Sequence, residues 1–228
     1  MTVLEKLRGS LVVSCQPVYD GPMDLPKITA AMALAAEAGG AAGLRIEGIN
    51  NLEVIRPLTR LPIIGIIKTD LSNSPVRISP FLENVMGLTA AGADIVAYDA
   101  TDRPRPVATA DLVGAIKQHG KLAMADCATL RDAQTALAEG ADIIGTTLSG
   151  YAYDIAPPDA GPDLDLIRTF SKLGGFVMAE GRLNSPHLAK LAMESGADCV
   201  TVGSAVTRVE HITNWFARAV DSSQGNHG

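Results

Sequence analysis

Short apolar runs alternate along the chain with longer alanine-rich segments in which apolar residues recur at helical spacing. Several runs are apolar at consecutive positions, as in Ile63-Ile64-Gly65-Ile66-Ile67, which is typical of strands buried on both faces. The apolar runs predict eight strands, over residues 11–16, 43–48, 62–68, 94–101, 122–127, 142–150, 176–182 and 198–205. The alanine-rich segments predict helices over residues 26–39, 50–60, 80–92, 107–119, 129–139, 163–173, 185–196 and 206–219.

Glycine and serine mark the ends of the predicted helices. A Gly-Ala-Asp sequence recurs at Gly92, Gly140 and Gly196, each time directly before a predicted strand. We expect each of these glycines to adopt the left-handed conformation that ends a helix. Ser79 and Ser185 each precede a proline, and this pair predicts an N-cap residue followed by proline at the first helical position.

Eight strands that each precede a helix, with no linker between two halves, predict an α/β protein with a single (β/α)8 TIM barrel. The barrel domain is expected over residues 1–221, and residues 222–228 are expected to form a disordered tail. A doubly wound open sheet is the structural alternative. It is disfavoured because no Gly-x-Gly-x-x-Gly motif follows a strand and no P-loop lysine motif is present.

Composition narrows the class of protein. Apolar residues make up 47% of the chain and charged residues 19%, so the chain can bury a full core. The formal net charge of −6 and the lack of a basic run argue against nucleic acid as a partner. No segment reads as a signal peptide or a membrane-spanning helix, so we expect a cytoplasmic protein without a membrane partner. The widely separated Cys15, Cys127 and Cys199 are expected to be buried apolar residues, with a nucleophilic cysteine as the alternative.

Polar side chains stand at the carboxyl ends of the predicted strands, where TIM barrels carry out their chemistry. They include Gln16, Arg45, Lys68, Asp126 and Glu180. A lysine at the mouth of an apolar barrel loses solvation, so its pKa should fall and Lys68 can act as a base. With Glu180 reaching the substrate from another direction, the pair suits proton abstraction beside a carbonyl, followed by reprotonation. An interior salt bridge without chemistry and a Schiff-base lysine are the alternatives.

Glycine-rich loops follow the last three predicted strands, where the phosphate site of a TIM barrel is frequently built. Glycine lets the backbone approach an anion closely, and a nearby arginine adds positive charge. The candidate phosphate-binding residues are Gly150, Gly181, Arg182, Gly203, Ser204 and Arg208. Ordinary turn glycines with surface arginines are the alternative.

Histidine is missing from the predicted strand ends. The four histidines all fall in helices or in the tail, at His119, His187, His211 and His227. We therefore expect neither a histidine base nor a histidine-containing metal centre at the site. A magnesium site built from oxygen ligands is a minor alternative, on Asp99, Asp102 and Asp126. The pair Trp215-Phe216 in the last predicted helix is expected in the core or at a subunit interface.

Eight motifs in order and at compatible spacing, over roughly residues 12–217, carry a family resemblance. They read SCQP (14–17), GLRIEG (43–48), GIIK (65–68), DIVAYDAT (94–101), MAD (124–126), GTTLSGY (145–151), AEGR (179–182) and TVGSAVTR (201–208). The combination of GTTLSGY with Lys68 and Glu180 is the most specific part. With these motifs the chain resembles the N-acetylmannosamine-6-phosphate 2-epimerase family.

The resemblance implies an epimerase of sialic acid catabolism that works without a cofactor or a metal. Such an enzyme interconverts N-acetylmannosamine 6-phosphate and N-acetylglucosamine 6-phosphate by proton exchange at C2. The resemblance also implies a homodimer, through the final helix, and Lys68 and Glu180 as the catalytic residues. The residues that it implies for binding the sugar and its phosphate are Gln16, Arg45, Asp126, Thr147, Gly150, Tyr151, Gly181, Arg182, Gly203, Ser204 and Arg208.

The chain departs from the family pattern beside the expected site. Thr69-Asp70-Leu71 follows Lys68 where Arg-Asp-Tyr is expected, and Cys127 follows Asp126 where a hydroxyl residue is common. These differences bear on substrate affinity rather than on the type of reaction.

Two other functions stay open on the sequence. One is a Schiff-base aldolase that uses Lys68 on a sugar phosphate, and the other is a barrel that binds a sugar phosphate without catalysis. An epimerase of the ribulose-phosphate type is disfavoured, because it would need histidines and paired aspartates around a metal.

Overall fold

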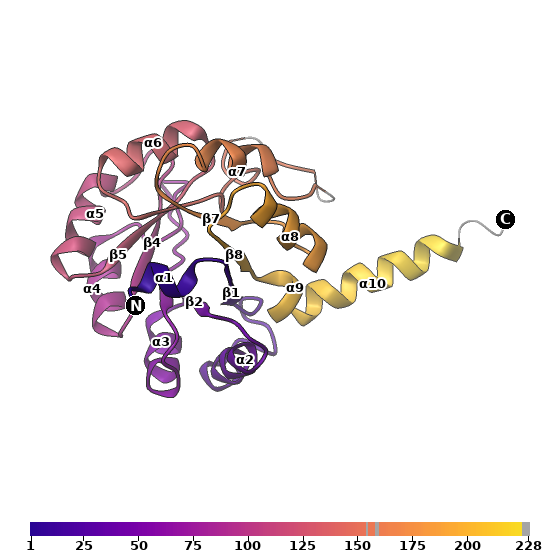
Figure 1. Cartoon of the computed structure of the whole chain (residues 1–228). Helices are drawn as coiled ribbons and strands as arrows, with labels where there is room; N and C mark the ends of the chain where they lie inside the picture. The colour runs from indigo at the N-terminus through magenta and orange to yellow at the C-terminus, as the bar shows by residue number, and fades with distance from the viewer. Residues whose placement is uncertain (154, 158–159, 225–228) are drawn as a thin grey trace.

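Eight apolar segments form short parallel strands that pair in chain order and close into a barrel in the computed structural model (Figure 1). The structure describes residues 1–153, 155–157 and 160–224. Closure comes from the pairing of the last strand with the first, in the register Ser10↔Cys199 to Val13↔Val202. The strands are β1 (Ser10–Cys15), β2 (Gly43–Glu47), β3 (Ile63–Ile66), β4 (Ile95–Asp99), β5 (Leu122–Asp126), β6 (Ile143–Gly145), β7 (Phe176–Glu180) and β8 (Cys199–Val202). The predicted TIM barrel is therefore confirmed.

Helices surround this barrel, and every predicted helix has a counterpart. They are α2 (Pro26–Ala38), α3 (Ile49–Ile55) with the 3-10 turn η1 (Arg56–Leu58), α4 (Leu82–Ala90), α5 (Thr109–Gln118), α6 (Leu130–Ala138), α7 (Leu164–Phe170), α8 (Pro186–Glu194), α9 (Ser204–Thr207) and α10 (Val209–Gln224). The last predicted helix is divided because Arg208, with φ −106° and ψ 88°, leaves the helical conformation. The helix α10 continues past the boundary predicted at residue 221, and residues 225–228 of the predicted tail lie outside the described residues.

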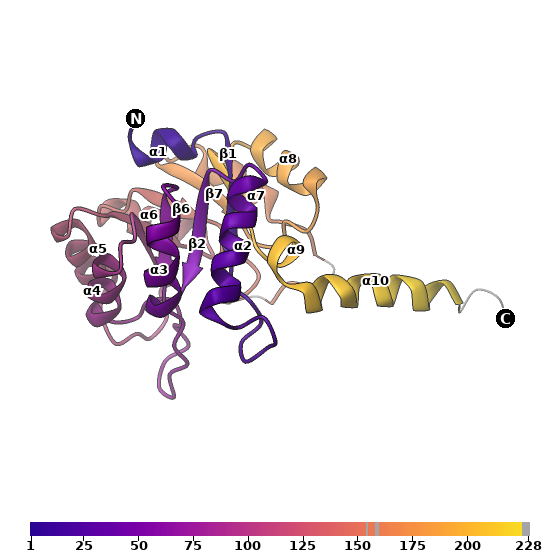
Figure 2. The ribbon, with the colours of Figure 1, turned by 90° about the horizontal axis from the view of Figure 1, so that it is seen from below.

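One helix was not expected from the apolar pattern. The N-cap of the helix α1 (Val3–Leu7) is Thr2, whose hydroxyl accepts a hydrogen bond from the Glu5 N–H in a capping box. Its Leu7 is fully buried with interior residues of the barrel. Figure 2 shows α1 at one end of the barrel, while the loops that follow β1 and β3 extend from the opposite end.

Strand side chains alternate between the inside of the barrel and the helix layer. The interior cluster takes every second strand residue, including Val12, Ile64, Ile66, Met124 and Met178. The other cluster joins the intervening strand residues, such as Val13 and Ile63, to the helices. This alternation determines which polar residues at the strand ends face the barrel axis.

The predicted helix boundaries are confirmed at four of five marked positions. Gly92, Gly140 and Gly196 have φ of 98°, 98° and 102°, and the Ser185 hydroxyl accepts a hydrogen bond from the Leu188 N–H as the N-cap of α8. The prediction for Ser79 was wrong, because α4 begins only at Leu82. Ser79 instead has φ 44° and hydrogen-bonds back to Ile67, which closes a loop rather than opening a helix.

The three cysteines are buried and free, as predicted. Burial raises the pKa of Cys15 to about 12 and that of Cys199 to about 11, and it raises the pKa of Cys127 well above its usual value. A nucleophilic thiolate is therefore disfavoured at all three positions. Within the described part of the chain, no helix is long and apolar enough to cross a membrane.

Candidate active site

A cavity of about 480 Å³ opens at the carboxyl ends of the strands, the end opposite α1. Ionisable, amide and hydroxyl side chains share its wall with a few apolar residues. The lining residues are Ser14, Gln16, Lys68, Thr147, Tyr151, Pro157, Glu180, Gly181, Arg182, Leu183, Asn184, Thr201, Gly203, Ser204, Arg208, His211 and Trp215. This is where a TIM barrel binds its ligand.

Lys68 and Glu180 lie on opposite sides of this cavity. Three strands separate β3 from β7 in either direction around the closed barrel. Each side chain continues the inward alternation of its strand, Lys68 after Ile64 and Ile66, and Glu180 after Met178. The structure therefore brings together, across one cavity, the two residues that the sequence predicts as catalytic.

The Lys68 amine has a lowered pKa that lies close to neutral pH. Its side chain is exposed to solvent where it borders the cavity, and the protein atoms on its other sides partly desolvate the amine. Burial lowers the pKa of Lys68 to about 8, and the positive charges of Arg208 and Arg45 lower it further against opposing effects from Glu47 and Glu180. At this pKa about one tenth of the amine is neutral at pH 7, which is enough for it to act as a base.

Glu180 has the opposite shift. Only 14% of its side chain is exposed, and its Oε2 lies 3.1 Å from Nη1 of Arg45. Burial raises the pKa of Glu180 above its usual range, and the charge of Asp126 adds to this effect while Arg45 opposes it. Glu180 can therefore carry a proton near neutral pH and also release it.

A buried ion pair lies next to Glu180. The Arg45 guanidinium donates to both carboxylate oxygens of Asp126, from Nη2 to Oδ2 at 2.6 Å and from Nη1 to Oδ1 at 3.2 Å. The two side chains are 1% and 0% exposed, and the Thr147 hydroxyl donates to Asp126 Oδ1 at 2.6 Å. Arg45 and Asp126 do not line the cavity. Their direct contact with the sugar stays a prediction. In the structure Arg45 contacts Glu180, and Asp126 accepts the hydrogen bond from Thr147.

On the side of β1 and β8, a second group of polar residues lines the cavity. The Gln16 amide donates from Nε2 to the Ser14 hydroxyl at 2.6 Å. Arg208 donates from Nε to the Gln16 carbonyl at 2.9 Å, which holds the guanidinium at the cavity wall. Gly203 and Ser204 follow β8 beside them. The structure thus brings these four predicted binding residues together.

The loops after β6 and β7 meet around Arg182. Its guanidinium donates from Nη1 to the Ser149 carbonyl at 2.5 Å and lies over the Tyr151 ring, 5.3 Å from the centroid. Gly150 lies next to the guanidinium with φ 75°, and a Cβ there would come within 2.7 Å of Nη1 of Arg182. Gly181, Arg182 and Tyr151 line the cavity. A glycine is needed at position 150 because a side chain there would collide with the Arg182 guanidinium.

Sequence reasoning missed several lining residues. Ser14 and Thr201 face inward by the same alternation as Gln16 and Cys199, so strand periodicity could have found them. The expectation of no histidine at the site was wrong, because His211 of α10 lines the cavity together with Trp215. No local signal in the sequence could show this, since it depends on where the chain turns between α9 and α10.

The minor magnesium alternative gains no support from the side chains. Asp126 is committed to Arg45, Asp99 pairs with Arg103 at 2.7 Å, and Asp102 lies on the exposed surface. Within the ranges that the structure describes, no group of three or more His, Cys, Asp or Glu residues could hold a metal ion.

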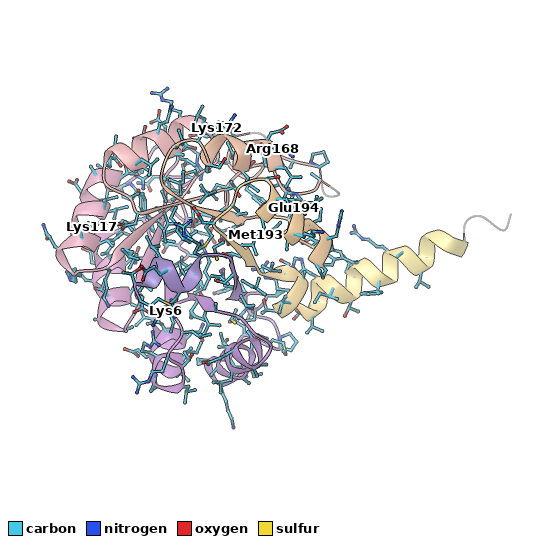
Figure 3. The ribbon with its side chains drawn as sticks, viewed as in Figure 1. Lys6, Lys117, Arg168, Lys172, Met193 and Glu194 are labelled. Atoms are coloured by element: carbon cyan, nitrogen blue, oxygen red, sulfur yellow. The ribbon has the colours of Figure 1, made fainter. Side chains whose placement is uncertain are left out.

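Lys117 and Lys172 lie away from the cavity, in the last turn of α5 and in the turn after α7. Figure 3 shows Lys117 and Lys172 at the periphery of the ring of helices, far from the barrel axis. Lys117 pairs there with Asp142. These residues therefore offer controls for substitutions at the cavity.

A closed (β/α)8 barrel with ionisable side chains converging on a cavity at the carboxyl ends of its strands has the form of a TIM-barrel enzyme. A family profile described as "Putative N-acetylmannosamine-6-phosphate epimerase" matches residues 29–222. The chain belongs to this family, and the predicted resemblance is confirmed.

Named relatives agree with this assignment. A protein of Haemophilus influenzae named "Putative N-acetylmannosamine-6-phosphate 2-epimerase" is 54% identical over 222 residues, which cover 97% of this chain and 96% of that protein. The "Bifunctional enzyme NanE/NanK" of Brucella melitensis is 57% identical over 221 residues, which cover 97% of this chain. The chain spans only 42% of the length of this bifunctional relative.

Solved structures show the same fold. The N-acetylmannosamine-6-phosphate 2-epimerase from Clostridium perfringens superposes with a TM-score of 0.92 at 38% identity, over 96% of both chains. A thiamine phosphate pyrophosphorylase from Pyrococcus furiosus superposes with a TM-score of 0.64 at 19% identity, over 90% of both chains, and shares the fold alone.

Proposed function

We propose that this chain is an N-acetylmannosamine-6-phosphate 2-epimerase that forms N-acetylglucosamine 6-phosphate by exchanging the proton at C2 of the open-chain sugar. The observation that carries the proposal is the placement of Lys68 and Glu180 across one cavity, with pKa values shifted toward neutrality from opposite sides. Two proton carriers facing each other can serve both faces of one carbon atom. Family membership supports this substrate.

The proposed reaction proceeds through an enolate. The neutral Lys68 amine takes the C2 proton, the C–H electrons form a C1–C2 double bond, and the C1 carbonyl oxygen becomes the enolate oxygen. Protonated Glu180 then delivers its proton to the opposite face of C2, and the enolate electrons return to restore the C1 carbonyl. In the reverse direction Glu180 is the base and the Lys68 ammonium is the acid.

Other residues of the cavity stabilise charge in this scheme. Hydrogen-bond donors near the reacting atoms lower the energy of the enolate. Arg208 is held at the wall by its hydrogen bond to the backbone carbonyl of Gln16, and the Gln16 amide by its hydrogen bond to Ser14. We assign the substrate phosphate to the loops after β7 and β8, where Arg182, Gly181, Gly203 and Ser204 border the cavity. Arg45, itself fixed by Asp126, would hold Glu180 in place through their ion pair.

We also propose a homodimer that forms through α10. This helix projects away from the barrel in both ribbon views (Figures 1 and 2). Val209, Phe216 and Val220 are 52%, 71% and 58% exposed and recur at helical spacing on it. A second copy would cover these side chains, and Phe216→Asp should then shift the mass measured by light scattering from dimer to monomer. A wild-type monomer at micromolar concentration would contradict this proposal.

The proposal includes a role in the cytoplasm, in the breakdown of sialic acid.

The proposed epimerisation is tested by proton NMR of N-acetylmannosamine 6-phosphate with the protein in D2O. The expected result is the appearance of the gluco epimer with loss of the C2 proton signal. Binding of the sugar without exchange at C2 would favour a non-catalytic barrel. Trapping of substrate on Lys68 by borohydride would favour the aldolase.

A further inference from the structure

Lys68 lies beyond the regular part of its strand. The strand β3 ends at Ile66, and its ladder with β4 covers only Ile64 and Gly65. From Lys68 the chain leaves the barrel as a loop that returns at Ile78, which forms an isolated antiparallel bridge with Lys68. Regular strand pairing therefore does not hold the backbone that carries the amine, and local contacts must do so.

The return of the loop supplies one anchor. The Ile67 N–H donates to the Ser79 hydroxyl at 3.2 Å, and the Ser79 N–H donates to the Ile67 carbonyl at 2.7 Å. Ser79 is fully buried, and its left-handed backbone makes this double contact. These bonds fix the residue before Lys68 from the side of β4. Within the loop, the Thr69 N–H also donates to the Arg77 carbonyl at 3.0 Å.

Glu47 supplies an anchor from the side of β2. It is the last residue of β2, paired in register with Ile66, and its Oε1 accepts a hydrogen bond from the Lys68 N–H at 3.2 Å. The strand alternation that turns Arg45 inward also turns Glu47 inward. A side chain of β2 thus continues the β2–β3 ladder where the backbone pairing stops.

The same carboxylate contributes to the charge around the Lys68 amine. The charged groups that act on this amine come from several elements, namely Arg45, Glu47, Glu180 and Arg208. Both arginines disfavour the ammonium and both glutamates favour it. Glu180 changes its own protonation in the proposed reaction, whereas Glu47 takes no part in the proposed proton transfers.

We propose that Glu47 is a positioning residue for Lys68, which fixes the backbone of the lysine at the barrel mouth and places a carboxylate near its amine. The inference rests on the proposed function, because it assigns Glu47 a part in preparing the proposed base. It goes beyond that function by naming a residue outside the cavity wall.

Glu47→Gln and Glu47→Ala separate the two parts of this role. Glutamine keeps an oxygen acceptor for the Lys68 N–H but removes the charge, so the ammonium loses support and the Lys68 pKa falls below about 8. In the direction in which Lys68 is the base, the acid limb of kcat/KM for C2 exchange should move to lower pH by about half a pH unit or more, with its plateau kept within about threefold. Alanine removes the acceptor as well, so its plateau should also drop about tenfold.

A second measurement keeps the inference testable without turnover. Competitive acetylation of Lys68 by acetic anhydride, followed by mass spectrometry across pH, reports the pKa of the amine directly. The Glu47→Gln protein should show a lower Lys68 pKa than wild type, and Glu53→Gln, at an exposed position of α3, should not. The conservative Glu47→Asp should restore much of the wild-type profile.

The outcomes distinguish this inference from the proposed function. A Glu47→Gln protein whose pH profile and acetylation curve match those of wild type would overturn the inference. So would a loss of thermal stability and plateau rate with no movement of either curve, because that pattern marks a purely structural residue. Wild-type protein that exchanges no proton at C2 would instead refute the proposed function, while the acetylation curves would still decide the effect of Glu47 on Lys68.

Discussion

Removing the charge of Asp126 should destabilise the fold and also disable Glu180. Asp126 and Arg45 are 0% and 1% exposed and joined by two hydrogen bonds, at 2.6 and 3.2 Å. Breaking a buried ion pair by removing one partner costs about 3–5 kcal/mol, because the other charge stays buried. Asparagine keeps one oxygen acceptor, and Glu180 remains 3.1 Å from Arg45. We therefore expect Asp126→Asn to cost about 3 kcal/mol, at the lower end of that range.

The catalytic effect follows from the charges around Glu180. The Asp126 carboxylate helps to raise the pKa of Glu180, and Arg45 opposes it. Without the Asp126 charge, nothing from that carboxylate offsets the effect of Arg45, so the pKa of Glu180 falls. The proton that Glu180 should deliver to C2 is then lost at lower pH, so the alkaline limb of kcat/KM in that direction should move toward lower pH.

Urea unfolding and the pH profile of C2 exchange measure the two effects. For a chain of this size, about 3 kcal/mol corresponds to a fall in Tm of about 6–12 °C. The double variant Arg45→Met with Asp126→Leu should recover stability, since apolar residues can replace a buried pair, but it should stay inactive. An Asp126→Asn protein within about 1 kcal/mol of wild type would refute the reasoning, because the pair would then not depend on the second charge.

Three further substitutions test the site. Lys68→Met should lower C2 exchange by at least about a thousandfold, while Lys117→Met on the outer helices should leave it unchanged. The Lys68 pKa is lowered to about 8 in the folded state, so the protonated lysine disfavours folding. Lys68→Met should therefore raise the Tm at pH 7, and this gain in Tm should shrink as the pH rises from 8 to about 10.4. A gain in Tm that stayed the same over this pH range would contradict the reasoning. Glu180→Gln should stop epimer formation but still let Lys68 exchange the C2 proton of one epimer with D2O, and NMR showing equal exchange of both epimers would count against two opposed proton carriers. Gly150→Ala should lower the Tm and raise KM, since the backbone is at φ 75° and the new Cβ would lie 2.6 Å from Cβ of Ala156; unchanged Tm and KM would show that the loop can yield.

Much of the fold follows from patterns that span only a few residues. Consecutive apolar residues identify buried strands, and the glycines at 92, 140 and 196 end helices by a conformation that other residues adopt at a cost. Ser79 shows where such local reasoning fails. A Ser-Pro pair is typical of a helix start, but here the long-range contacts with Ile67 decide the conformation of the serine.

Some residues of the candidate site could likewise be predicted from the sequence, and others could not. Lys68 and Glu180 could be selected from their places at strand ends, and the predicted fall of the Lys68 pKa agrees with the structure because an apolar barrel desolvates any amine at its mouth. The cavity contributions of His211 and Trp215 could not be predicted, since they depend on the break at Arg208 that directs α10.

The sequence by itself determined the period of the barrel, the order of its strands and the residue types at their carboxyl ends, because these depend on neighbours along the chain. Only the tertiary structure decided that Arg45 pairs with Asp126, 81 positions away, and that Glu180 lies 3.1 Å from the same arginine. Closure of the barrel brings these groups together and excludes water from them. Charge interactions strengthen with burial and proximity, so the proton affinities of the site arise only when the chain is folded.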